Sequence, residues 1–357
     1  MNKKVLVAMS GGVDSSVTAL LLQEKGYDCT GATMNLFQNE TIGLPVDRTC
    51  CSVYDIKDAA DVCKRIGIEH KVFNFQERFR EDVIERFVDS YESGRTPNPC
   101  IECNRYMKFG RLLEKAEELG FEMVATGHYA RVEFDKTVGR YYLKKAKDKK
   151  KDQTYVLYSL SQKALGHAVF PLGELTKDEV RSIAARHGFD NAEKPESQDI
   201  CFVKNQSYAD FIEFFTGKKH PEGNFLDMSG NIIGRHKGII RYTVGQRKGL
   251  GVNFGEPVYV YDKDPVSNTV TLARDRELYS SEAIVKDINL IISDRIEGEL
   301  CLYAKTRYNQ EAQPAKVTQP DENTLRIVFD EPQRAITKGQ AAVLYDGEYV
   351  FGGGTIV

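Results

Sequence analysis

The first 127 residues alternate between strand-like and helix-like segments, and this alternation constrains the fold more than any other feature of the chain. Short apolar runs read as strands, and stretches with apolar residues at helical spacing, closed by glycine, read as helices. The expected strands are 5–9, 29–34, 71–75 and 123–127, and the expected helices are 15–25, 55–67, 79–93 and 106–119. Farther along, Thr176 and Glu179 form a capping-box pattern that predicts another helix, ending at Gly188. Such alternation predicts a doubly wound parallel sheet with helices on both faces.

The chain changes character after residue 206. Glycines and turn residues multiply there, and the helical spacing of apolar residues disappears. Beyond residue 280, short apolar runs and the hairpin signal Asp346-Gly347 are typical of a small antiparallel barrel. We therefore expect an α/β protein with three domains: a catalytic domain at 1–206, a small central domain at 207–279 and a C-terminal antiparallel β-barrel at 280–357.

Composition narrows the class of protein. Hydrophobic residues make up 41% of the 357 residues and charged residues 28%, which is the balance of a globular protein. No apolar run approaches bilayer length, and the run after Lys3 and Lys4 is too short for a secretory leader, which favours a cytoplasmic location. Eight cysteines are too few for a secreted disulfide scaffold, so they are candidates for thiolate chemistry or metal binding.

A glycine-rich turn joins the first expected strand to the first expected helix. Its sequence, SGGVDSS at 10–16, places backbone N–H groups and three hydroxyls at a helix N-terminus, where anions bind. Gly11 and Gly12 let the backbone approach a ligand, and Asp14 can hold Mg²⁺. The Walker pattern requires a lysine that this loop lacks, which argues against a P-loop kinase or GTPase. The loop instead resembles the PP-loop of the ATP pyrophosphatase superfamily, with its adenine nucleotide alpha hydrolase-like fold, whose members cleave ATP to AMP and pyrophosphate.

Two cysteines three residues apart, Cys100 and Cys103, follow two prolines. Such a pair supplies half of a structural zinc site, with Cys50 and Cys51 as the only nearby doublet in the sequence. It is also a redox motif, although thioredoxin-like folds place that motif after a strand rather than after Pro-Asn-Pro. From the residues alone both alternatives stay open.

Seven motifs in a fixed order resemble the tRNA-specific 2-thiouridylase family (MnmA) over nearly the entire chain. They are SGGVDSS, TPNPCIECN, KFG, ATGHYAR, KDQTYVLY, SQDICFV and VGQRKGLG. The resemblance implies ATP-dependent 2-thiolation of the wobble uridine in tRNA anticodons. ATP with Mg²⁺ would adenylate the uridine C2 oxygen, and sulfur would then replace that oxygen with release of AMP.

The resemblance assigns catalytic roles to Asp14, Cys103 and Cys201. Cys201 would carry the incoming sulfur as a persulfide, and Cys103 would release it, leaving a Cys103–Cys201 disulfide. Some family members have aspartate at the position of Cys100, where it is a candidate acid or base, and a thiol cannot be assumed to do that job. Cys100, Cys103 and Cys201 could instead hold three irons of a [4Fe-4S] cluster whose fourth iron binds hydrosulfide.

The other cysteines receive lesser roles. Cys50 and Cys51 could be further cluster ligands or relay thiols. Cys29, Cys63 and Cys301 lie in apolar strand or helix patterns, so we expect them to be inert core residues.

The resemblance also implies two sets of ligand contacts. The ATP contacts would be Ala8, Met9, Ser10, Gly11, Gly12, Val13, Asp14, Ser15, Ser16, Met34 and Gly127. The tRNA contacts would be Asn98, Pro99, Cys100, His128, Lys151, Asp152, Gln153, Arg307, Tyr308 and Gln340. The central domain would contact the tRNA as well.

Local charge favours an RNA partner although the net charge of -3 does not. The segment 144–151 is rich in lysine, and the segment 231–250 contains basic residues without any acidic one, a pattern that favours contact with phosphates. The resemblance implies two partners, the anticodon arm of tRNA and a sulfur-donor protein such as a cysteine desulfurase or a sulfur relay protein. Two alternatives stay open: a PP-loop amidating ligase, which delivers nitrogen and needs no paired thiols, and a sulfur carrier or iron-sulfur protein that binds tRNA without modifying it.

Overall fold

The computed structural model describes residues 3–38, 42–43, 53–194, 200–203, 206–252 and 255–357. Cys50 and Cys51, considered above as ligands or relay thiols, lie outside the described residues. The chain divides into two compact units. The first unit consists of Met1–Ile84, Pro99–Lys204 and Asp346–Gly352, and the second of Glu85–Asn98, Asn205–Tyr345 and Gly353–Val357. The expected division into three domains at 206 and 279 is a different partition and stays a prediction.

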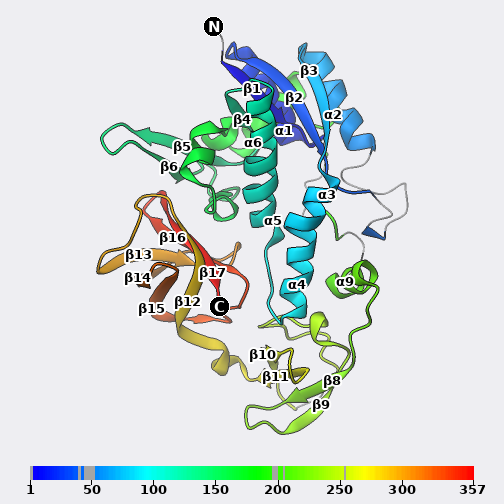
Figure 1. Ribbon diagram of the computed structural model, residues 1–357, viewed down its shortest axis with the longest axis vertical. Coiled ribbons are helices and arrows are strands. Elements are labelled where there is room, and N and C mark those ends of the chain that lie inside the picture. Colours follow the sequence, from blue (N-terminus) through cyan, green and yellow to red (C-terminus); the bar gives the residue numbers. More distant parts are fainter. Residues whose placement is uncertain (1–2, 39–41, 44–52, 195–199, 204–205, 253–254) are drawn as a thin grey trace. The chain divides into compact units, whose positions relative to one another are not determined.

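A five-stranded parallel sheet forms the centre of the first unit (Figure 1). Its strand order is β3 (Glu69–Asn74), β2 (Asp28–Asn35), β1 (Lys4–Ala8), β4 (Met123–Ala125) and β7 (Ala168–Val169). The side chains of Val5, Leu6 and Val7 in β1 are all fully buried. Because successive strand residues point to opposite faces, both faces of the sheet are covered. The predicted parallel sheet is confirmed, with β7 as a fifth strand that the sequence did not indicate.

Helices of the first unit occupy the connections between these strands. They are α1 (Val13–Glu24), α2 (Val53–Ile66), α3 (Gln76–Phe79), α5 (Pro99–Glu102), α6 (Leu112–Glu118), α7 (Gln162–His167) and α8 (Lys177–Arg186), with π-helical segments η2 (Arg80–Glu85) and η3 (Cys103–Arg111). Helix α1 packs against both α2 and α8. Helix α8 begins with the predicted capping box, in which Thr176 and Glu179 satisfy each other's backbone N–H groups.

An antiparallel hairpin, β5 (Ala130–Asp135) and β6 (Arg140–Lys145), completes the first unit. The first residue of β17 (Tyr349–Ile356) pairs with it, since Tyr349 is in register with Lys144. The Tyr349 hydroxyl also donates a hydrogen bond to Glu133 at 3.0 Å. This hairpin was not predicted from the sequence.

In the second unit, helix α4 (Arg86–Glu92) packs against helix α9 (Tyr208–Thr216) through aromatic rings. The Phe87 ring lies 5.9 Å from that of Tyr208 and 6.3 Å from that of Phe211. The Tyr91 ring lies 6.0 Å from that of Tyr208. These contacts bury a segment that is distant in sequence from the rest of this unit, and they stabilise the stretch that leads to Cys100.

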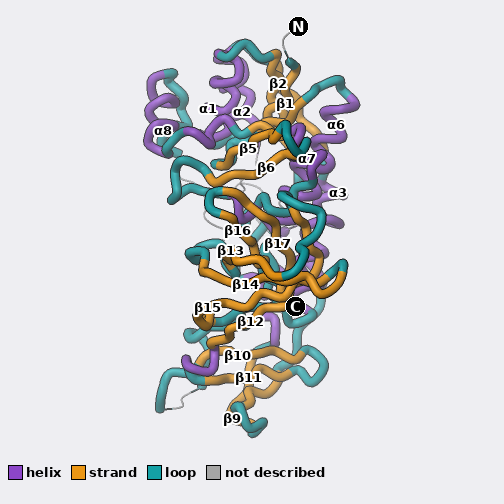
Figure 2. Tube along the Cα trace, turned by 90° about the vertical axis from the view of Figure 1, so that its left-hand side faces the viewer, coloured by secondary structure: helices purple, strands orange, loops and turns teal. Residues whose placement is uncertain are grey.

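Two sheets make up most of the second unit. The smaller has the order β10 (Tyr259–Asp264), β11 (Thr269–Ala273), β8 (Gly223–Leu226) and β9 (Ile232–His236). The larger runs β12 (Tyr279–Leu290), β15 (Thr324–Arg334), β14 (Gln313–Asp321), β13 (Glu299–Lys305), β16 (Ala341–Asp346) and β17, and pairing of β12 with β17 closes it into a barrel (Figure 2). The predicted antiparallel barrel is confirmed. The hairpin signal is confirmed too, because Gly347 has φ +57° between β16 and β17.

Burial differs among the three cysteines that were expected to be inert core residues. Cys29 and Cys63 are buried, and burial raises their thiol pKa to about 11 and about 12. The same expectation is wrong for Cys301, which is exposed. Cys301 lies on the outward side of β13, whereas Leu302 and Ala304, on the other side of the strand, point into the barrel. None of the helices in the described part of the chain has the length and apolar character needed to cross a bilayer.

Candidate active site

The phosphate loop connects β1 to α1, and its hydroxyls hold the first turn of the helix. Ser15 Oγ donates to the Gly12 carbonyl oxygen at 2.9 Å, and Ser16 Oγ donates to the same oxygen at 3.1 Å. The backbone N–H of Ser10 donates to Ser15 Oγ at 3.2 Å. Gly12 is the N-cap of α1, so the N–H groups of the first turn have no acceptor within the helix. This arrangement is suited to binding an anion.

Two glycines let other chain segments approach this loop closely. Gly11 has φ +71°, and a Cβ at this position would lie 2.6 Å from the carbonyl oxygen of Asp55. A Cβ at Gly127 would lie 2.9 Å from the carbonyl carbon of Asp14 and 3.0 Å from the backbone nitrogen of Ser15. Glycine is therefore required at both positions for the loop to keep its conformation.

The Asp14 carboxylate is held by two residues from distant parts of the first unit. Lys177 Nζ donates to Asp14 Oδ1 at 2.7 Å and to Oδ2 at 2.8 Å. The Tyr129 hydroxyl donates to Oδ1 at 2.9 Å. Gln153 in turn holds Tyr129, because its Oε1 accepts from the Tyr129 backbone N–H at 2.9 Å. Sequence reasoning found Asp14 and Gln153 but missed Lys177 and Tyr129.

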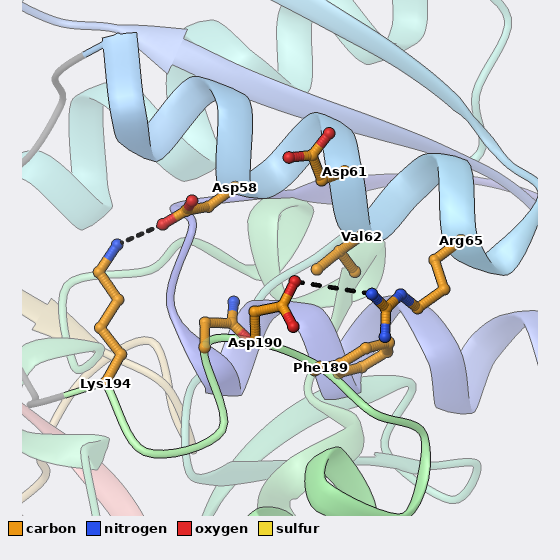
Figure 3. A pocket seen from close by; sticks show the side chains of 8 residues that line it. Asp58, Asp61, Val62, Arg65, Phe189, Asp190 and Lys194 are labelled. Carbon is orange, nitrogen blue, oxygen red and sulfur yellow. Dashed lines mark hydrogen bonds and ion pairs between the residues drawn. The ribbon is translucent and has the colours of Figure 1, made fainter.

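A pocket of about 330 Å³ lies beside the phosphate loop (Figure 3). Its walls come from α2 and the segment after α8, with Asp58, Asp61, Val62, Arg65, Phe189, Asp190, Asn191 and Lys194 as lining residues. Lys194 Nζ lies 2.8 Å from Asp58 Oδ2, and Asn191 Nδ2 donates to the Gly11 carbonyl oxygen at 3.0 Å and to Ser16 Oγ at 2.9 Å. The expected ATP contacts, all of which are described, do not line this pocket. The contacts of Asn191 instead brace the phosphate loop.

The remaining expected ATP contacts lie at the carboxyl edge of the parallel sheet. Ala8 is the last residue of β1, and the Met9 backbone N–H donates to the Ala32 carbonyl oxygen at 2.8 Å. The side chains of Met9 and Val13 are buried in the core, whereas Met34, near the end of β2, is partly exposed. This edge is where open α/β sheets bind ligands, and contact of these residues with ATP stays a prediction.

Cys100 and Cys103 lie on successive helical segments, Cys100 in α5 and Cys103 at the start of η3. The buried Asn104 fixes this segment by donating from Nδ2 to the Val156 carbonyl oxygen at 2.9 Å. Burial raises the pKa of the Cys103 thiol to about 11, the Lys108 ammonium opposes this shift, and Cys100 adds to it. Cys103 is therefore a neutral thiol near pH 7, with a cation close enough to favour its ionisation.

Cys201 lies in a turn closed by a hydrogen bond of 3.0 Å from the Val203 backbone N–H to the Ile200 carbonyl oxygen. The adjacent Phe202 is buried, and its ring packs edge-on against that of Phe79 at 5.8 Å. Phe202 anchors the turn in the core and leaves Cys201 partly exposed. The cysteine is thus accessible on a fixed piece of backbone.

Cys103 and Cys201 are both partly exposed. The disulfide between them that the resemblance implies stays a prediction. In the described ranges no group of three His, Cys, Asp or Glu side chains is placed to hold a metal ion. An iron-sulfur cluster held by Cys100, Cys103 and Cys201 stays a prediction.

His128 follows β4 and is buried between two aromatic rings, those of Phe109 and Phe170. Lys108 Nζ lies 3.4 Å from Nε2, and Nδ1 lies 2.6 Å from Thr126 Oγ1. An ammonium can only donate, so Nε2 accepts and the proton of the neutral ring is on Nδ1. Burial, together with Lys108, lowers the pKa of His128 well below 6.5. Lys108 thus interacts with both His128 and Cys103, and its place in the KFG motif was the signal that could have identified it.

Three expected tRNA contacts lie in the loop after β6. Asp152 accepts from the Ala146 backbone N–H at 2.9 Å and from Thr154 Oγ1 at 2.6 Å. Gln153 is hydrogen-bonded to the backbone of Tyr129, as described above. Lys151 is partly exposed at the end of the lysine-rich segment. Asp152 and Gln153 therefore hold this loop in shape, and contact of all three residues with tRNA stays a prediction.

The expected tRNA contacts of the second unit have similar intramolecular partners. Arg307 Nη2 donates to the Ala335 carbonyl oxygen at 2.7 Å. Gln340 Nε2 donates to the Thr96 carbonyl oxygen at 2.7 Å, which holds the segment ending at Asn98 against the barrel. Tyr308 is 38% exposed, and its ring lies 5.9 Å from Lys305 Nζ. Pro99, which follows Asn98, is buried at the start of α5.

A parallel sheet whose first strand feeds a glycine-rich, aspartate-containing loop at a helix N-terminus is the arrangement of the PP-loop class of nucleotide-binding proteins. Family models match almost the whole chain: a tRNA methyl transferase HUP domain at residues 3–205, a tRNA methyl transferase PRC-barrel domain at 209–274 and an aminomethyltransferase beta-barrel domain at 280–356.

Curated relatives match over nearly their full length. The tRNA-specific 2-thiouridylase MnmA of Clostridioides difficile (strain 630) is 50% identical over 356 residues, covering 100% of this chain and 98% of the relative. Proteins of the same name from Carboxydothermus hydrogenoformans and Desulforamulus reducens are 49% and 47% identical, and the matches cover 99% and 100% of this chain and 97% of each relative. The chain therefore belongs to the tRNA-specific 2-thiouridylase (MnmA) family, and the resemblance found in the sequence is confirmed.

Proposed function

We propose that the protein is an ATP-dependent tRNA-uridine 2-sulfurtransferase that thiolates C2 of the wobble uridine in tRNA anticodons. The observation that carries this proposal is the 50% identity to a 2-thiouridylase over essentially the full length of both chains. The placement of the chemical groups supports it, because the phosphate loop, Cys103 and Cys201 belong to the same compact unit. Activation by ATP and transfer of sulfur thus have their residues in one part of the fold.

In the first half-reaction the uridine O2 attacks the α-phosphorus of ATP. The bond from O2 to phosphorus forms, the bond from phosphorus to the bridging oxygen breaks, pyrophosphate leaves with both electrons, and the N3 proton passes to water. The first turn of α1 binds the phosphates through its N–H groups. Asp14 would hold Mg²⁺, which offsets phosphate charge when bound, and its side chain fits this role because it is 30% exposed at the loop.

In the second half-reaction the terminal sulfur of a Cys201 persulfide attacks C2, and AMP leaves with the electrons of the C2–O bond. The Cys103 thiolate then attacks Cys201 Sγ. The persulfide S–S bond breaks towards the sulfur on C2, which yields 2-thiouridine and a Cys103–Cys201 disulfide. A dithiol reductant restores the two thiols, and a sulfur-donor protein, a cysteine desulfurase or a relay protein, reloads Cys201.

Cys103 must ionise to take part in this step. Its pKa of about 11 keeps it protonated at neutral pH, which protects it from unproductive oxidation. Lys108 lowers that pKa and is therefore the cation that promotes thiolate formation. Cys100 stands where some family members have aspartate, and burial raises the pKa of its thiol while Lys108 opposes that shift.

Hydrosulfide bound to a [4Fe-4S] cluster is the other form in which sulfur can be delivered. It requires Cys100, Cys103 and Cys201 within reach of one cluster, and the described residues contain no such group. We therefore derive no step through a cluster, and the iron content of active protein decides between the two forms.

We expect some residues to contact tRNA directly and others to hold the loops that contact it. The basic segments 144–151 and 231–250 are suited to the phosphate backbone, and Lys151 and Tyr308 are partly exposed for direct contact. Asp152 and Gln340 are hydrogen-bonded within their own units, so each also holds a neighbouring loop in shape. The wobble uridine must leave its stack to reach the adenylation site.

The test is to incubate anaerobically purified protein with Mg-ATP, cysteine, a cysteine desulfurase that donates persulfide sulfur, and a tRNA transcript that carries a wobble uridine. Released pyrophosphate and AMP are quantified, and the nucleosides are analysed by mass spectrometry. We expect replacement of one oxygen by one sulfur in uridine. Cys201→Ser and Cys103→Ser should release pyrophosphate without forming thiouridine, whereas Cys301→Ser, which removes the exposed barrel thiol, should behave as the wild type.

Each alternative predicts a different result. An amidating ligase would incorporate nitrogen, and a tRNA-binding carrier would bind the transcript without consuming ATP. Thiouridine formed by Cys201→Ser would exclude the persulfide route. Iron-free protein with full activity would exclude the cluster, and loss of activity on removal of iron would overturn the persulfide mechanism.

A further inference from the structure

The phosphate loop has a net negative charge, although its expected ligand, ATP, is an anion. Residues 10–16 include one carboxylate, Asp14, and no lysine or arginine. A triphosphate that approaches an unpaired carboxylate is repelled, and this repulsion is strong where protein atoms replace water. Binding of ATP therefore needs a cation at Asp14, either Mg²⁺ or a basic side chain from elsewhere in the chain.

Helix α8 supplies such a cation. Lys177, its first residue, places its ammonium 2.7 Å and 2.8 Å from the two carboxylate oxygens of Asp14. The Lys177 side chain is only 7% exposed, while that of Asp14 is 30% exposed. The lysine thus reaches the loop from inside the protein, and the carboxylate remains accessible from solvent.

The backbone of Lys177 is held in place by the elements around it. Its N–H donates to Asp148 Oδ2 at 3.0 Å, and the capping box of Thr176 and Glu179 fixes the start of α8. The ring of Tyr129 lies 5.8 Å from Lys177 Nζ. These contacts set the ammonium at the phosphate loop with little freedom to leave it.

We propose that Lys177 supplies the positive charge of the phosphate loop from a distant helix: its ammonium neutralises Asp14 while no metal is bound, and it faces the phosphates once Asp14 binds Mg²⁺. Lys177 is then a positioning residue for the nucleotide in the reaction proposed above, on which this inference rests. It stands in for the lysine that the Walker loop carries within its own sequence.

The alternative is a purely structural ion pair that joins α8 to α1. A buried ion pair is weak evidence for such a role, because apolar residues of similar size often join two helices equally well. The two readings differ in their dependence on Mg²⁺. A structural pair affects nucleotide binding equally with and without metal, whereas the proposed role matters most when no metal offsets the charge of Asp14.

The test measures the dissociation constant of α,β-methylene-ATP, whose α–β bridge is not cleaved, by isothermal titration calorimetry in excess Mg²⁺ and in EDTA. We expect Lys177→Met to raise the ratio of the EDTA value to the Mg²⁺ value at least about fivefold over wild type. Lys177→Arg keeps the charge and should restore the ratio. Lys163→Met, which removes an exposed lysine paired with Glu117, should leave the ratio unchanged.

An unchanged ratio in Lys177→Met, with affinity either retained or lost equally in both conditions, would overturn the inference. If Lys177→Met fails to fold, Lys177→Gln takes its place, because glutamine removes the charge but keeps a hydrogen-bond donor: a wild-type ratio in Lys177→Gln would overturn the inference. Wild-type protein that binds no nucleotide in either condition would instead contradict the proposed function, so the two failures are distinguishable.

Discussion

Substitution of Gly127 by alanine tests whether the strand end at β4 sets the position of the phosphate loop. The added Cβ would lie 2.9 Å from Asp14 C and 3.0 Å from Ser15 N, against ordinary contacts of about 3.4–4 Å. Both atoms belong to the backbone of the first turn of α1, so neither can move aside by rotation of a side chain. The first turn must therefore shift by roughly half an ångström or more, and overpacking of this kind costs about 1–3 kcal/mol.

The same shift displaces the N–H groups that bind phosphate. We expect Gly127→Ala to lose about tenfold or more in affinity for Mg²⁺-bound α,β-methylene-ATP, because misplacement by about 1 Å costs up to about a hundredfold. Calorimetry measures the affinity and urea denaturation the stability. Gly139→Ala is the matched control, since Gly139 has φ +68° in the hairpin between β5 and β6 and a Cβ there would meet no atom within 4 Å. It should lose about 1–2 kcal/mol of stability from the left-handed backbone but keep its affinity. Equal affinities of Gly127→Ala and wild type would refute the reasoning.

Three further substitutions probe other parts of the protein. Burial lowers the pKa of Lys263 to about 8 from an ordinary value near 10.5. As the pH drops from about 10.5 to about 8, the unfolded chain binds a proton that the folded protein does not, so the free energy of unfolding falls. Urea denaturation of Lys263→Met should lack this fall. In Gly339→Ala the added Cβ would lie 2.8 Å from Thr96 N and would displace the segment that ends at the expected tRNA contact Asn98. Binding of tRNA in filter assays should therefore weaken while ATP affinity stays the same, and unchanged tRNA affinity would contradict this. Lys108→Met should slow alkylation of Cys103 by iodoacetamide at pH 8, because loss of the cation raises the thiol pKa further; an equal rate would exclude Lys108 from ionising Cys103.

Features with short-range causes were predictable from the sequence. The phosphate loop depends on Gly11, Gly12 and the hydroxyls of residues 10–16, and the capping box depends on Thr176 and Glu179, whose hydrogen bonds span three residues. Alternation of strands and helices likewise predicted a parallel sheet. In each case the groups that interact are close together in sequence, so their spacing carries the information.

Features with long-range causes were not predictable. Asp14 and Lys177 are 163 residues apart, and no local pattern connects them. The exposure of Cys301 was misjudged because the apolar run 300–304 hides the two-residue alternation that places Cys301 outside the barrel and Leu302 inside. Burial on one face of a strand depends on what packs there, and a single sequence does not state this.

Two lysines set the electrostatics of the chemistry: Lys108, which belongs to the KFG motif, and Lys177, which lies outside the seven motifs. Lys177 neutralises a carboxylate, which favours the approach of an anionic nucleotide. Lys108 opposes the effect of burial on Cys103, which favours a thiolate in a place where the thiol pKa would otherwise rise further above 11. At pH 8 a pKa of about 11 leaves about one thiol in a thousand ionised, so even a modest stabilisation of the thiolate changes the rate of sulfur release in proportion. The phosphate loop and the cysteines indicate the type of reaction, whereas the fold sets the positions of Lys108 and Lys177 beside them.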